Sequence, residues 1–83
     1  MTHKEEVEKW ERFRAQNRPY LESVADSLET IAAKHERTRR MLDNIKTGDS
    51  PYDGPIDRIC TKLYHIARDC EKAAEAAKEI MKE

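Results

Sequence analysis

Two stretches of the sequence place their apolar residues at alternating intervals of three and four. One runs from residue 21 to residue 45 and the other from residue 56 to residue 80. Residues spaced in this way fall on one side of an α-helix, which repeats every 3.6 residues. The spacing therefore predicts an all-α fold built on two long amphipathic helices.

In heptad notation, the spaced residues occupy positions a and d. They are Leu21, Val24, Leu28, Ile31, His35, Thr38, Leu42 and Ile45 in the first stretch, and Ile56, Ile59, Leu63, Ile66, Cys70, Ala73, Ala77 and Ile80 in the second. Small or apolar residues at position e widen the stripe to about three positions in seven, which suits a helical bundle. These are Ala25, Ala32, Cys60, Ala67, Ala74 and Met81.

The segment between the two stretches carries the signals of a loop. Residues 47–54 contain both glycines, and a proline lies on each side of Gly54 within residues 51–55. Pro55 suits the first turn of a helix. We therefore expect helices over about 19–46 and 55–82, joined by a loop over 47–54. Their equal length and short connection predict an antiparallel hairpin within a single domain spanning 1–83.

A shorter helix is expected before the hairpin. Thr2 and Glu5 have the spacing of a capping box, so this helix should begin near His3. Pro19 removes a backbone donor and restricts the residue before it, which predicts a break or sharp kink at 17–19. The short helix over about 3–17 carries Trp10 and Phe13. We expect these aromatic residues to dock onto the hairpin, or else to anchor another protein.

The composition indicates that the chain does not complete its core alone. Only 37% of its 83 residues are hydrophobic, and a chain of this size buries only about 60% of its unfolded surface. We therefore expect the hairpin to form a bundle as a homodimer, although the first helix or a separate target could also cover the stripe. The residues expected in the core or in self-association are Leu21, Leu28, Ile31, Leu42, Ile59, Leu63 and Ile66.

Two polar residues, His35 and Thr38, interrupt the apolar stripe of the first long helix near its middle. The favoured interpretation is a polar layer that fixes register and partner number at some cost in stability. The alternative is a ligand or proton-sensing site, because histidine titrates near neutral pH. A carboxylate-bridged metal site would need a glutamate three residues before His35 or His65, and neither has one. No metal and no cofactor are expected.

Basic residues concentrate around this interruption. Residues 33–68 carry eight Lys and Arg against five Asp and Glu, within a chain of net charge −1. The cluster is interpreted as a solvated face with ion pairs, or as an anion site for RNA, DNA or a phosphorylated small molecule. The candidate residues are His35, Arg37, Arg39, Arg40, Arg58 and Lys62. A neutral total argues against a general polyanion binder.

The remaining signals bear on class and location. Cys60 and Cys70 lie about 15 Å apart along one helix, so they cannot pair while that helix is intact. No apolar run approaches the length of a membrane span and no signal peptide is visible, so a cytoplasmic protein is expected. The sequence shows no reactive constellation and no enzyme is expected. The leading hypothesis is a small helical inhibitor or adaptor that acts on a protein partner through its surface. Capture of RNA or a nucleotide is the second.

Overall fold

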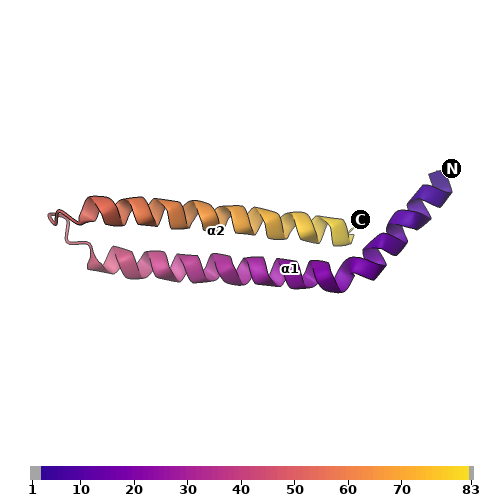
Figure 1. Ribbon diagram of the computed structural model, residues 1–83, viewed down its shortest axis with the longest axis horizontal. Coiled ribbons are helices and arrows are strands. Elements are labelled where there is room, and N and C mark those ends of the chain that lie inside the picture. Colours follow the sequence, from indigo (N-terminus) through magenta and orange to yellow (C-terminus); the bar gives the residue numbers. More distant parts are fainter. Residues whose placement is uncertain (1–2, 83) are drawn as a thin grey trace.

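A computed structural model describes residues 3–82 of the chain, which form a helical hairpin. Helix α1 spans His3–Ile45 and helix α2 spans Asp53–Lys82, with no strand among these residues. The two helices run antiparallel, side by side, and the N-terminal part of α1 extends beyond the end of α2 (Figure 1). The expected all-α hairpin is therefore confirmed. Neither helix contains an apolar stretch long enough to cross a membrane.

The loop over residues 46–52 is held by side chains at the start of α2. The Asp53 carboxylate accepts hydrogen bonds from the backbone N–H of Gly48 at 2.8 Å and from that of Thr47 at 3.4 Å. Gly48 has φ +92°, a conformation that favours glycine. Asp53 also places a negative charge in the first turn of α2. The helix therefore begins at Asp53, two residues before the expected start, and Pro55 lies in its first turn.

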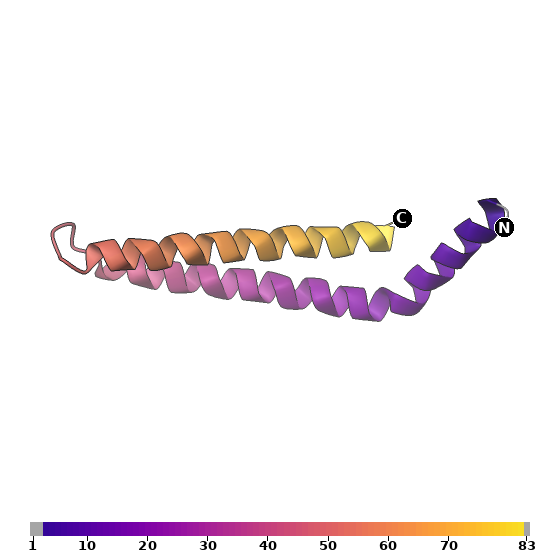
Figure 2. The same cartoon turned by 45° about the horizontal axis from the view of Figure 1, so that its top comes forward.

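The expected separate helix over 3–17 is not formed, because α1 continues through Pro19 to Ile45. Proline removes only one intrahelical hydrogen bond, so a long helix can bend at this point and continue. Asn17 donates its side-chain amide to the Phe13 carbonyl at 2.8 Å, one turn before the bend. Figure 2 shows the N-terminal part angled away from the rest of α1. Helix α1 is described from His3 onward, and Thr2, the expected cap, lies outside the described residues.

The two helices meet through small side chains. The buried residues are Ala25 and Ala32 of α1 together with Cys60, Ala67, Ala74 and Ala77 of α2. All but Ala77 occupy position e, so the seam between the helices lies along positions a and e, and not along a and d. Alanine lets two backbones approach closely, and this contact turns the larger d residues away from the seam.

The residues expected in the core or in self-association are not buried within the hairpin itself. Leu21, Leu28, Leu42 and Leu63 at position a are only half-buried. Ile31, Ile59 and Ile66 at position d are exposed. The described residues include no large side chain that is fully buried. The hairpin contact alone therefore removes little large apolar surface from water.

Polar contacts fix the register of the hairpin. Lys46 pairs with Asp57 near the loop, and Lys78 pairs with Glu29 toward the open end. At the end of α2, the Arg18 guanidinium donates to the Met81 carbonyl at 2.9 Å. That hydrogen bond satisfies one of the last carbonyls of α2, which have no partner within their own helix. These contacts thus align α2 with the part of α1 that follows Arg18.

The hairpin is a single layer of helices. Its extents are 67 × 20 × 12 Å, and its shortest dimension matches the diameter of one helix. The accessible surface is 6580 Å², whereas a compact protein of 9.7 kDa exposes about 5,100 Å². Stable domains need a second layer to cover their apolar surface. The chain therefore exposes about 1,500 Å² more than a compact protein of its mass.

The close seam predicts a size limit at Ala32. Ala32→Leu should lower the free energy of unfolding by about 1–3 kcal/mol, because the added atoms would force the two backbones apart. The matched variant Ala33→Leu adds the same atoms at the next residue, which is exposed, and should change it by less than about 0.5 kcal/mol. Urea unfolding followed by circular dichroism measures both. Equal effects would contradict the close alanine seam.

Candidate interaction surfaces

The exposed d positions of the two helices form one apolar strip, which we call the d face. Antiparallel helices that meet through equivalent positions are related by a twofold axis perpendicular to the plane of the hairpin. That axis keeps the d flank of α1 and the d flank of α2 on the same side. The exposed fractions of the large apolar side chains along this strip run from 39% for Ile31 to 62% for Ile45. The d face consists of Val24, Ile31, Thr38, Ile45, Ile59, Ile66, Ala73 and Ile80.

The polar interruption lies near the middle of the d face. Nδ1 of His35 lies 2.8 Å from the Ile31 carbonyl oxygen, and Thr38 donates its hydroxyl to the Lys34 carbonyl at 3.0 Å. In both cases the side chain bonds back to its own helix one turn earlier. The Thr38 hydroxyl therefore has a partner without any second molecule. His35 is half-buried and keeps its other ring nitrogen for a contact outside the helix.

The structure does not gather the six basic candidates into one site. Arg37 and Arg40 occupy positions c and f of α1, on the side away from α2. Arg58 and Lys62 occupy positions c and g of α2, on the side away from α1. These four side chains thus lie along opposite edges of the hairpin, while His35 and Arg39 lie near the seam.

Arg39 is committed to its own helix. Its guanidinium bonds the Glu36 carboxylate at 2.9 Å and 3.3 Å and that of Asp43 at 3.4 Å. The hydrogen bond from Arg39 lowers the pKa of Glu36. The same hydrogen bond to the Glu36 carboxylate stabilises the charged guanidinium and raises the pKa of Arg39. This guanidinium is therefore engaged by two carboxylates of its own helix.

The two cysteines are free thiols. Cys60 is buried in the seam, with its Sγ 3.6 Å from an Asp43 carboxylate oxygen and 3.9 Å from the Arg39 carbonyl oxygen. Burial, followed by the nearby Asp43 charge, raises the pKa of Cys60. A raised pKa keeps the sulfur protonated and opposes nucleophilic chemistry. Cys70 is half-buried beside the d face.

The aromatic pair lies on the part of α1 that α2 does not reach. We call residues 3–17 the arm. Trp10 and Phe13 pack edge to face at 5.8 Å between ring centroids, and the Lys9 ammonium lies 5.2 Å from the centre of the Trp10 ring. The two aromatic side chains remain 51% and 47% exposed. The expected docking of these residues on the hairpin is therefore wrong, because the arm continues beyond the end of α2.

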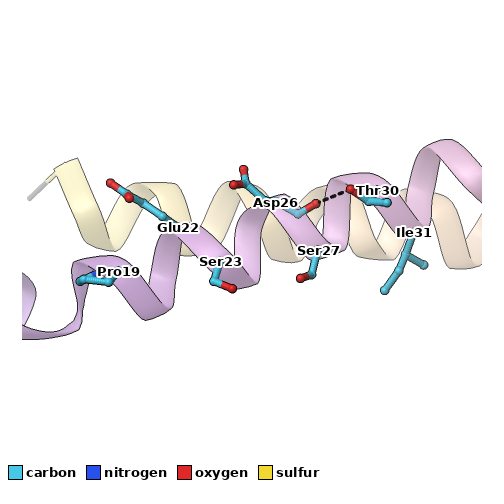
Figure 3. A pocket seen from close by; sticks show the side chains of 7 residues that line it. All are labelled: Pro19, Glu22, Ser23, Asp26, Ser27, Thr30 and Ile31. Carbon is cyan, nitrogen blue, oxygen red and sulfur yellow. Dashed lines mark hydrogen bonds between the residues drawn. The ribbon is translucent and has the colours of Figure 1, made fainter.

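A shallow hollow runs beside α1 at the open end of the hairpin. Figure 3 shows its lining side chains, which all come from α1, with the hydroxyl of Thr30 bonded to the Asp26 carbonyl at 2.8 Å. The lining contains carboxylates and hydroxyls but no histidine, cysteine or lysine that could act as a base beside them. The lining residues are Pro19, Glu22, Ser23, Asp26, Ser27, Thr30 and Ile31. With only α1 as a wall, it offers no enclosed site.

Other sites are not indicated within residues 3–82. These residues contain no group of three or more His, Cys, Asp or Glu side chains that could hold a metal ion. Sequence reasoning placed positions a, d and e in one apolar stripe, but it missed that the e residues form the seam and that the d residues, including Val24 and Ile80, are left exposed. The regular alanines at e were the signal for the seam. No protein-family model, curated protein or solved structure matches the chain.

The Glu36–Arg39 pair predicts part of the acid sensitivity. A carboxyl whose pKa is lowered by folding contributes stability above its unfolded pKa and loses it as the pH falls through the folded value. The melting temperature of the protein should therefore drop below about pH 4.5, and Arg39→Ala should show a smaller drop. Arg40→Ala, the control, should keep most of it. Thermal melts between pH 7 and pH 3 measure the difference, and identical acid profiles for the protein and Arg39→Ala would contradict this role.

Proposed function

We propose that the protein is a non-enzymatic interaction module that works as a homodimer, in which the d faces of two hairpins cover each other in a four-helix bundle. The exposure of the d face carries this proposal. Ile31, Ile59 and Ile66 repeat at heptad spacing on one side of a single helical layer. Such spacing is what helices use to pack against further helices.

The area fits this assembly. Each chain exposes about 1,500 Å² more than a compact protein of its mass. A standard interface buries about 800 Å² per partner, and obligate homodimers bury more. A second hairpin matches the d face in length and in heptad repeat. It would cover the isoleucines and further bury the half-buried leucines at position a.

The proposed dimer would also give the polar residues His35 and Thr38 a structural role. Thr38 lies within the d face and His35 lies beside it, so both would face the second hairpin. Polar residues inside a bundle disfavour registers that leave them without partners. His35 and Thr38 would therefore select one alignment of the two hairpins, which the isoleucines alone would not do.

The proposed dimer leaves the outer edges for a different partner. Arg37 and Arg40 are exposed, form no ion pair with another described residue and face away from α2. Tyr52, in the loop region 48–54, is 71% exposed. Tyrosine and arginine are frequent anchors of protein interfaces. A small inhibitor or adaptor would use this edge against a protein target, and its two free thiols suit a reducing, cytoplasmic setting.

The dimer is tested by charge placed on the d face. The double variant Ile31→Glu with Ile66→Glu would bury unpaired carboxylates at the proposed interface. We expect the mass from size-exclusion chromatography with light scattering to fall from twice 9.7 kDa to the single-chain value. An unchanged dimeric mass would contradict the proposed interface.

The control for this test uses the neighbouring residues. Thr30→Glu with His65→Glu adds the same charge at positions c, outside the d face. This variant should remain dimeric at the concentration that dissociates the first. Loss of the dimer in both variants would mean that net charge, and not the d face, governs association.

Anion capture is the alternative function, and it has a separate test. Because the exposed cations lie on opposite edges, we expect no binding of a single-stranded RNA oligonucleotide at 200 mM salt. Fluorescence anisotropy at 50 and 200 mM salt measures this. Binding that falls steeply with salt and is lost in Arg37→Glu with Arg40→Glu would favour the anion function instead, because counterion release makes polyanion binding steeply salt-dependent.

A further inference from the structure

We propose that the two hairpins of the dimer pack with their loops at the same end, so that their arms cross and the Trp10 and Phe13 side chains of each arm pack against the arm of the partner subunit. This inference rests on the proposed dimer and specifies its symmetry. It also identifies what covers the exposed aromatic pair, which is the arm of a second copy of the chain.

The aromatic side chains continue the d face into the arm. Counting back in sevens from Val24 places Trp10 at position d, and Phe13 falls at the adjacent position g. Because α1 remains helical through Pro19, this heptad phase is carried from the hairpin into the arm. The apolar side of the arm therefore faces the same direction as the d face.

The bend tilts the arm across the hairpin. In the view down the shortest axis, the arm leans toward the side of α2 (Figure 1). The described chain is thin along that axis, with a shortest extent of 12 Å. The heptad positions of Trp10 and Phe13 therefore place their exposed surface on the side of the arm that continues the d face.

Two twofold axes could place one d face on another. An axis along the hairpin puts both loops at one end and both arms at the other, where two arms that lean across the hairpin must cross. An axis across the hairpin puts the loops at opposite ends, and each arm then projects past its partner. Only the axis along the hairpin covers the exposed aromatic side chains with a second copy.

Charges at the edge of the d face favour the same axis. Lys34 and Asp69 both occupy position g, next to the d face and at the same height in the hairpin. Neither forms an ion pair with another described residue. With loops at the same end, α1 lies over α2 of the partner subunit, so Lys34 faces the partner subunit's Asp69 twice across the dimer. With loops at opposite ends, Lys34 would lie near its own copy instead.

The other cations do not oppose this arrangement strongly. The arginines at positions c and f, such as Arg37, Arg40 and Arg58, project from the outer edges and away from the d face. Exposed charges separated by more than about 8 Å are largely screened at physiological salt. The charges beside the interface, such as Lys34 and Asp69, therefore affect the choice of axis more than the distant arginines do.

The symmetry is tested by disulfides between mixed single-cysteine variants, made with Cys60→Ala and Cys70→Ala. With loops at the same end, Val24 lies over Ile80 of the partner subunit. Mixing Val24→Cys with Ile80→Cys should then give a covalent dimer on oxidation. With loops at opposite ends, Val24 would instead lie over Ile45 of the partner subunit. Because we propose the first arrangement, the matched mixture of Val24→Cys with Ile45→Cys should give no covalent dimer. The opposite pattern would overturn the proposal.

The arms are tested through Trp10, the one tryptophan of the chain. In the dimer, its emission should be blue-shifted and its acrylamide quenching constant several-fold smaller than in the dissociated Ile31→Glu with Ile66→Glu variant. The Thr30→Glu with His65→Glu control should keep the protected signal. A dimer whose Trp10 is quenched as in free solution would overturn the crossing of the arms. A single-chain mass for the unaltered protein would instead reject the dimer itself.

Discussion

The close approach of two helices through alanine is the constraint on which the rest of the structure depends. Ala25, Ala32, Ala67 and Ala74 are buried between the two helices, and Leu21 and Leu28 pack against the buried cluster at the open end. A seam of this kind fixes the rotation of each helix about its axis. Once that rotation is set, the isoleucines at position d must lie on one flank, and the antiparallel arrangement brings both flanks to the same side.

That rotation links the packing of the chain to its proposed activity. The seam makes a hairpin of defined register but leaves the large apolar side chains at its surface, so the molecule is one layer thick. A second hairpin supplies the missing layer without any change in the first. Because the d face is used for assembly, the outer edges and the loop are the surfaces that remain for another protein.

Much of the hairpin could be predicted because helix periodicity, loop residues and equal segment lengths are local signals. The rotation of the helices could not, because the a/d stripe and the a/e seam share position a and differ only in whether isoleucine at d or alanine at e lies between the helices. Pro19 was also ambiguous, since the same residue ends a short helix or bends a long one. Nor could the basic candidates be placed: Arg37 and Arg58 share a charge cluster in the sequence, yet the hairpin puts them on opposite edges.

Small-angle X-ray scattering on the unaltered protein measures the central claim most directly, since it reports mass and thickness together. If two d faces cover each other, the scattering mass will be twice 9.7 kDa, and the particle will be about two helix diameters thick. A mass of one chain with a radius of gyration near 19.5 Å would describe the isolated hairpin. That result would contradict the account.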